Sequence, residues 1–159
     1  MKKIIIAIDS FKGCLTSAEA GKAAEKGIKS INPFCHTSVI PIADGSEGLL
    51  DVLITATKGK YITLSAHGPL MKMAKTHYGL SGNGRTAIIE MAAISGLPLV
   101  PIEQRNPMLT TTFGTGELIK DALNKGCRNF IIGIGGSATN DAGLGMLQAL
   151  GFRFLDKSG

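Results

Sequence analysis

The chain has 159 residues, of which 44% are hydrophobic, 18% charged and 5% aromatic, and its formal net charge at pH 7 is +5. This apolar content is enough for one core of ordinary size or for two incomplete ones. The lysines are scattered singly with few aromatic residues among them, which argues against a nucleic-acid groove. No stretch approaches the roughly 20 apolar residues of a membrane span, so we expect no membrane partner.

The cysteines and the first residues indicate a cytoplasmic protein. Cys14, Cys35 and Cys127 are widely spaced and form no C-x-x-C pair, so we expect reduced thiols rather than a disulfide or a metal site. The apolar run 4–8 is too short for the core of a signal peptide and ends at Asp9.

Residues 2–8 form a short β-branched run, which predicts a buried parallel strand that opens into the polar segment 9–13, DSFKG. Thr16 and Glu19 have the spacing of a capping box, and an amphipathic helix follows. Asn32-Pro33 ends that helix, because proline cannot continue it.

Residues 37–42 repeat the strand pattern and lead into 43–48, ADGSEG, and then into a second helix whose apolar stripe is Leu49, Leu50, Leu53 and Ile54. The order strand, helix, strand, helix predicts a parallel sheet of Rossmann or flavodoxin-like type. Ligands of such sheets bind beside the carboxyl ends of the strands.

After Gly59 the pattern changes to short strands joined by tight turns. We place a domain boundary near residue 62, so that 1–62 begins a first α/β domain and 63–159 a second, mixed α/β domain, both incomplete. The predicted elements of the second domain are strands at 61–66, 75–80, 86–90 and 129–134, helices at 116–124 and 143–150, and the start of a strand at 152–155.

Two glycine-rich stretches resemble nucleotide motifs. Residues 79–86, GLSGNGRT, fit a phosphate-binding loop except for Arg85, but a strand pattern follows, so a hairpin turn is the better interpretation. Residues 133–138 fit the G-x-G-x-x-A dinucleotide fingerprint, with Asp156 near the position of a ribose-binding acid. A nucleotide-binding oxidoreductase therefore remains an alternative.

Three polar, glycine-bearing loops, 9–13, 43–48 and 135–141, lie where a strand leads to a helix. Helix N-termini attract anions through their free N–H groups and dipole, so the three loops indicate a cleft for phosphate or carboxylate groups. Asp44 with Glu47 three residues later also has the spacing of a helix cap. No capping pattern explains Lys12 beside Asp9.

The sequence resembles the bacterial type I glycerate kinase family over its whole length. The segments that carry the resemblance are DSFKG at 9–13, ADGSEG at 43–48, IEMAA at 89–93, NPMLTTTFGTGELI at 106–119 and GGSATND at 135–141. The family usually has proline at Ile8, serine at Cys14, glycine at Ser46, leucine at Met108 and tyrosine at Phe113. Its members are more than twice as long, and their C-terminal half completes both α/β domains.

The resemblance implies ATP-dependent, Mg²⁺-dependent phosphorylation of D-glycerate, with 2-phosphoglycerate as the favoured product. Phosphoryl transfer needs an oriented acceptor hydroxyl and positive charge at the phosphate oxygens. We expect the three loops to supply these parts: as catalytic residues Asp9, Lys12 and Asp44; as substrate-binding residues Ser10, Gly45, Ser46 and Glu47; as phosphate-binding residues Gly135, Gly136, Ser137 and Asn140; and as Mg²⁺ ligands Asp141 and Glu47. A homodimer, association with the missing C-terminal half, and an inactive fragment are further expectations.

Overall fold

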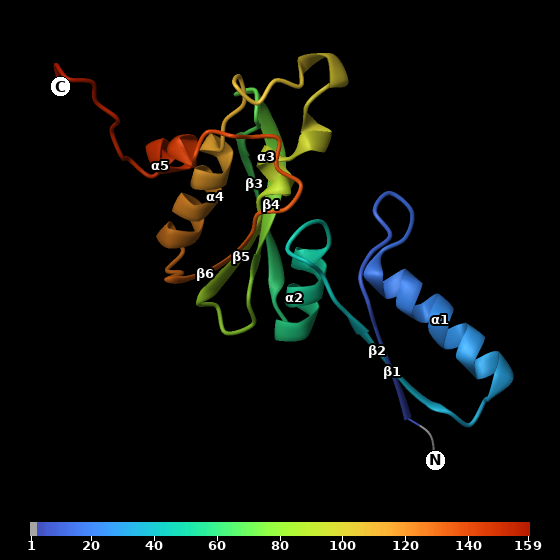
Figure 1. Cartoon of the computed structure of the whole chain (residues 1–159). Helices are drawn as coiled ribbons and strands as arrows, with labels where there is room; N and C mark the ends of the chain where they lie inside the picture. The colour runs from blue at the N-terminus through green and yellow to red at the C-terminus, as the bar shows by residue number, and fades with distance from the viewer. Residues whose placement is uncertain (1–2) are drawn as a thin grey trace.

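The computed structural model describes residues 3–159 as an α/β chain in which two sheets share no strand (Figure 1). β1 (Lys3–Ile8) and β2 (His36–Pro41) pair in parallel, with Ile6 opposite Val39. α1 (Ser17–Ile31) links them and lies beside them in the figure. The predicted parallel pairing is confirmed, and Lys2 lies outside the described residues.

The predicted capping box starts α1. The Glu19 N–H donates to Oγ1 of Thr16 at 3.2 Å, and the Thr16 N–H donates to Oε2 of Glu19 at 2.8 Å. Gly21 packs so tightly on Val39 that a Cβ there would overlap its side chain. Because side chains alternate along a strand, Ile5 and Ile40 point away from α1 and stay exposed.

The second sheet is mixed, as predicted, with the order β3-β4-β5-β6. β3 (Lys60–His67), β4 (Met73–Leu80) and β5 (Thr86–Glu90) are antiparallel neighbours, and β6 (Asn129–Gly133) pairs in parallel with β5. The turn between β4 and β5 is closed by Oδ1 of Asn83, which accepts the Arg85 N–H at 2.9 Å. The hairpin prediction for GLSGNGRT is therefore confirmed.

Helices cover both faces of this sheet. Ile88 and Ile89 are fully buried and, as neighbours on β5, point to opposite faces. Ile88 packs with Leu50 of α2 (Leu49–Thr57), and Ile89 packs with Leu118 of α4 (Phe113–Asn124). α2 thus packs on the four-stranded sheet, although it follows β2 in the chain. The domain boundary near residue 62 stays a prediction.

α5 (Leu144–Ala149) packs on α4, where Gly116 allows the two backbones to approach closely. Three short helices, α3 (Ala92–Ser95), η1 (Leu97–Leu99) and η2 (Ile102–Gln104), follow β5. The strand expected at 152–155 is absent from the described chain, because that exposed segment pairs with no strand there. Within residues 3–159, no helix has the length and apolar character to cross a bilayer.

Candidate active site

The loop after β1 meets the loop after β2 through an ion pair. Nζ of Lys12 lies 3.8 Å from Oδ2 of Asp44, and the two side chains are 64% and 54% exposed. A solvent-exposed pair contributes at most about 1 kcal/mol to stability. Two predicted catalytic residues are therefore close together at a place where their charges remain accessible.

Asp9 lies at the end of β1, half-buried, and its Oδ1 accepts the N–H of Ser10 at 2.7 Å. A tight turn follows, in which the Phe11 N–H donates to the carbonyl of Leu15 at 2.9 Å. Gly13 has φ of +74°, a left-handed conformation that glycine adopts without strain. The turn presents Lys12 to solvent.

The predicted cap formed by Asp44 and Glu47 is wrong. α2 begins at Leu49, its N-cap is Gly48 with φ of +91°, and no side chain caps it. Asp44 instead forms a local turn, in which its Oδ1 accepts the Ser46 hydroxyl and, at 3.0 Å, the Ser46 N–H. The carboxylate of Asp44 is thus bonded within its own turn and caps none of the N–H groups at the start of α2.

The Ser46 hydroxyl, followed by the Ser46 N–H, lowers the pKa of Asp44, so that this exposed carboxylate is ionised at neutral pH. Ser46 itself is buried. Ser46 stands where the resembling family has glycine, and its side chain is accommodated inside the loop as a hydrogen-bond donor to Asp44. Glu47 is exposed and adjoins this turn.

Glu90, which the sequence reasoning did not select, occupies the N-terminus of α2. It ends β5 at 9% exposure, and its Oε2 accepts the Leu50 N–H at 3.4 Å. Burial raises the pKa of Glu90, against the opposing effect of the Leu50 and Gly48 N–H groups. The sequence pattern could have indicated this position, because side chains alternate along β5 and Glu90 therefore shares a face with Ile88, the face that α2 covers.

The third loop is bonded to the second. The Gly135 N–H donates to the Gly45 carbonyl at 3.0 Å, and a Cβ at Gly135 would lie 2.9 Å from Cα of Ser46. A Cβ at Gly133 would lie 2.6 Å from the same carbonyl. Two glycines of the dinucleotide-like fingerprint are thus explained by contact with the chain's own loop, which weakens the oxidoreductase alternative.

The remaining predicted residues of the third loop are only partly available. The Gly136 carbonyl accepts the Leu97 N–H at 2.9 Å, and the Ser137 hydroxyl lies 2.8 Å from that of Thr139. Asn140 is exposed. The loop therefore adjoins the loop of Asp44 through Gly135, and the Ser137 hydroxyl is engaged within its own loop.

Asp141 does not fit the predicted role of a Mg²⁺ ligand. Its Oδ2 accepts the N–H and hydroxyl of Thr112, each at 2.8 Å, and the N–H of Gly145 at 3.1 Å, while its Oδ1 accepts that of Gly143. Burial acts to raise the pKa of Asp141, but these bonds, first those from Thr112, outweigh it and lower that pKa. The carboxylate is a structural link between the starts of α4 and α5.

Among residues 3–159, no group of three His, Cys, Asp or Glu side chains is arranged to hold a metal ion. Mg²⁺ in kinases is often held by only one or two carboxylates together with the phosphates of the substrate. The exposed carboxylates of Asp44 and Glu47 fit that requirement, and Asp141 does not.

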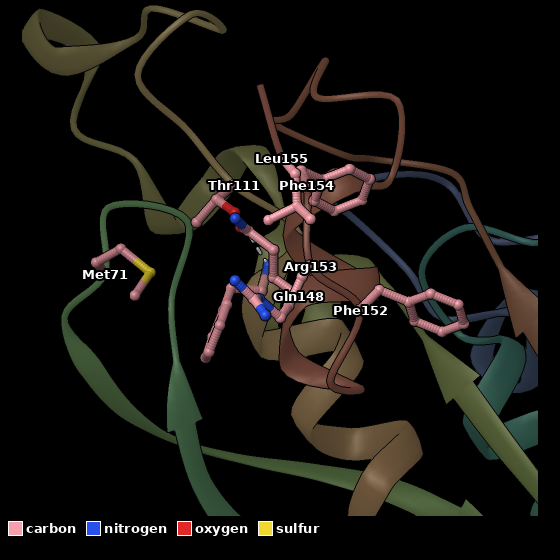
Figure 2. A pocket seen from close by; sticks show the side chains of 8 residues that line it. Met71, Thr111, Gln148, Phe152, Arg153, Phe154 and Leu155 are labelled. Atoms are coloured by element: carbon pink, nitrogen blue, oxygen red, sulfur yellow. Dashed lines mark hydrogen bonds between the residues drawn. The ribbon is translucent and has the colours of Figure 1, made fainter. Parts of the chain in front are cut away.

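Two cavities lie near the second sheet. The larger, of about 720 Å³, is bounded by the exposed tail 152–155 and by Met71, Thr111, Phe113 and Gln148 (Figure 2). It contains none of the predicted site residues. The smaller, of about 250 Å³, lies between the segment 105–110 and residues 137–139. It includes Ser137, and so adjoins the third loop.

The comparisons with known proteins agree with one another. The chain matches the model of the glycerate kinase family over residues 4–159. It is 55% identical to a glycerate kinase of Bacillus subtilis (strain 168) and 51% identical to a glycerate 2-kinase of Escherichia coli (strain K12), covering 99% of this chain and 41% of each relative. A solved structure of a candidate glycerate kinase 2 from Salmonella typhimurium LT2 superposes with a TM-score of 0.85 at 49% identity, covering 99% of this chain and 42% of that one.

The chain spans about two fifths of the length of these relatives. The match to the family model includes all three loops described above. On the family match and on these identities, the chain belongs to the glycerate kinase family.

Proposed function

We propose that the chain carries the phosphoryl-transfer loops of an ATP-dependent kinase that phosphorylates D-glycerate. The observation that carries the proposal is the meeting of three loops. Lys12 faces Asp44 at 3.8 Å, and the Gly45 carbonyl beside Asp44 accepts the Gly135 N–H at 3.0 Å. The names of the relatives supply glycerate as the acceptor.

In this proposal Asp9 orients the glycerate hydroxyl or accepts its proton, and Ser10 lies beside it as a substrate contact. Lys12 places positive charge next to the transferred phosphoryl group. Phosphoryl transfer depends on such positioning and charge, since little covalent chemistry is asked of the protein. The low pKa of Asp44 keeps a negative charge in the site at neutral pH.

Asp44 and Glu47 would hold Mg²⁺ together with the phosphates of ATP, and the ion would neutralise charge on those phosphates. Gly136, Ser137 and Asn140 are the proposed phosphate contacts of the third loop. The Gly135 N–H already donates to the Gly45 carbonyl, so Gly135 would allow the two loops to approach closely rather than donate to a phosphate. The name of the Escherichia coli relative favours the 2-phosphate as product.

The test compares glycerate-dependent ATP turnover of the parent chain with that of Asp9→Asn and Lys12→Met. Loss of a group that acts in the transition state lowers kcat/KM by about 100-fold or more. Lys26→Met, on the solvent-exposed side of α1, is the matched control and should retain parental turnover. Activity within about threefold of the parent for either site variant would remove that residue from the mechanism.

A further inference from the structure

The cavity of about 250 Å³ beside the third loop has a lining suited to a small organic acid. Its polar residues are Arg105, Asn106, Thr110, Ser137 and Thr139, and its apolar wall is made by residues such as Leu97, Val100 and Pro107. The lining contains one cation and no carboxylate. A ligand bound there would thus meet positive charge, hydroxyl groups and a patch that can cover carbon.

Hydrogen bonds fix the orientation of the polar residues around this cavity. Nε of Arg105 donates to the carbonyl of Val100 at 3.2 Å, which holds the guanidinium group at the wall. Oδ1 of Asn106 accepts the Met108 N–H at 3.0 Å, which leaves its amide nitrogen as a donor. The guanidinium retains its terminal N–H groups, the fork that binds carboxylates in bidentate fashion.

The two sides of the cavity are tied to each other. Thr110 is buried, and its hydroxyl donates to the carbonyl of Ala138 at 2.8 Å. The same loop bonds to the Gly45 carbonyl through Gly135, two residues before Ser137. Two residues span at most about 7 Å, so Ser137, at the edge of the cavity, lies within that distance of Gly135, whose N–H contacts the loop that holds Asp44.

We propose that this cavity is the subsite for the carboxylate end of the hydroxy acid substrate, with Arg105 as the partner of the carboxylate and the hydroxyl of Thr139 as the partner of a substrate hydroxyl. The inference rests on the proposed function, because the acceptor comes from there. The volume lies below the roughly 300–1,000 Å³ of pockets that bury drug-sized ligands, so it suits a three-carbon acid better than a nucleoside triphosphate.

The test is a nuclear magnetic resonance titration of the ¹⁵N-labelled chain with D-glycerate, with glycerol, which lacks the carboxylate, and with inorganic phosphate. D-glycerate is expected to shift the amide signals of 105–110 and 137–139, whereas glycerol leaves them in place and phosphate does not displace D-glycerate. Arg105→Gln should weaken D-glycerate binding by about 10-fold or more, the usual effect of losing a charge-assisted hydrogen bond. Arg105→Lys should be intermediate, because it keeps the charge and loses the fork.

Arg85→Gln is the matched control, since Arg85 is exposed in the turn between β4 and β5, away from the cavity lining. It should bind D-glycerate as the parent does. Unchanged affinity in Arg105→Gln, or shifts confined to 9–13 and 44–48, would overturn the subsite. Displacement of D-glycerate by inorganic phosphate would overturn it as well, by assigning the cavity to a phosphoryl group.

Failure of the subsite and failure of the kinase proposal give different results. Glycerate-dependent ATP turnover without shifts at 105–110 would overturn the subsite and leave the kinase proposal intact. Shifts at 105–110 that vanish in Arg105→Gln, in a chain without turnover, would support the subsite while removing the kinase proposal. An absence of any D-glycerate binding would overturn both.

Discussion

Glu90 shows how one residue of the second sheet helps to position the loop after β2. Its carboxylate accepts the N–H of Leu50, at the first turn of a helix that has no side-chain cap of its own. Burial raises the pKa of Glu90, and the nearby carboxylates of Asp51 and Glu47 act in the same direction. The folded chain therefore retains the proton of Glu90 to a higher pH than the unfolded chain does.

The raised pKa gives Glu90→Gln a defined pH dependence. Below the ordinary carboxyl pKa, Glu90 is protonated in both the folded and the unfolded chain. The difference in stability between the parent and the variant should therefore not change with pH in this range. As pH rises from the ordinary pKa through the raised pKa, the unfolded parent releases this proton before the folded parent does. The stability of the parent therefore falls relative to that of the variant, which cannot ionise. The melting temperature of Glu90→Gln minus that of the parent should thus increase between about pH 4 and pH 7.

Glu103→Gln, at an exposed glutamate of η2, is the control. Its melting temperature relative to the parent should stay constant over the same range. A difference for Glu90→Gln that is flat, or that decreases with rising pH, would show that the Glu90 environment is not the one described.

Sequence reasoning placed two loops at a shared sheet edge correctly, and it missed side chains whose partners come from an element that the sequence pattern did not place beside them. Lys12 and Asp44 could be brought together because loops at the carboxyl ends of paired parallel strands share an edge. Asp141 could not be recognised as a structural link, because its partner Thr112 is 29 residues away. Glu90 was missed for the same reason, since Leu50 lies 40 residues before it.

At the scale of elements, the contact between the loop after β2 and the loop after β6 depends on glycine. Gly133 and Gly135 leave room for the Gly45 carbonyl and for Ser46. The cap of α2 was misassigned because the three-residue spacing from Asp44 to Glu47 resembles a capping box, whereas the helix begins only after the turn at Ser46 and the left-handed Gly48. The predicted capping box of α1 was correct, since a box is a local pattern.

We predict that Gly135→Ala separates these two loops. The added Cβ would lie 2.9 Å from Cα of Ser46, a contact that requires a backbone shift, and overpacking of this kind costs about 1–3 kcal/mol. A lower melting temperature and reduced glycerate-dependent ATP turnover are expected together, because the shift also moves Asp44.

Gly27→Ala is the matched control. Gly27 is exposed in α1, and a Cβ there meets nothing within 4 Å. Alanine in a helix interior is favoured over glycine by about 1 kcal/mol, so this variant should melt slightly higher and keep its turnover. A Gly135→Ala protein with parental melting and turnover would contradict the loop contact.

At the scale of the whole molecule, the two sheets differ in how well they are covered. In the four-stranded sheet, Tyr78, Ile88 and Ile89 are fully buried between α2 and α4. The pair β1–β2 is covered by α1 on one face, and Ile5 on the other face is 59% exposed. A pair of strands with one covered face buries less apolar surface than a sheet covered on both faces, so less free energy opposes its local opening.

Hydrogen exchange should reveal this difference. Amides of β1 and β2 are expected to exchange faster than those of β4 and β5, because local opening requires less loss of buried contact there. Mass spectrometry of peptides from 3–8 and 86–90 would measure both rates in one sample. Equal protection of the two sheets would contradict the expected difference.

The α/β architecture, the parallel first pair and the mixed second sheet followed from strand and helix periodicity and from turn residues. The packing of α2 on the second sheet did not, because it depends on contact with Ile88 of β5, which comes two hairpins later in the chain. The missing strand at 152–155 reflects the same limit, since an apolar run forms a strand only beside a partner.

The most direct test of the kinase assignment is ³¹P nuclear magnetic resonance of the chain mixed with ATP, Mg²⁺ and D-glycerate. We expect a new phosphate-ester signal that depends on D-glycerate and disappears with Lys12→Met. Coupling to a single proton would identify the 2-phosphate, and coupling to two protons the 3-phosphate. A chain that melts cooperatively, yet forms no phosphoglycerate, would contradict the claim that these three loops carry out the transfer.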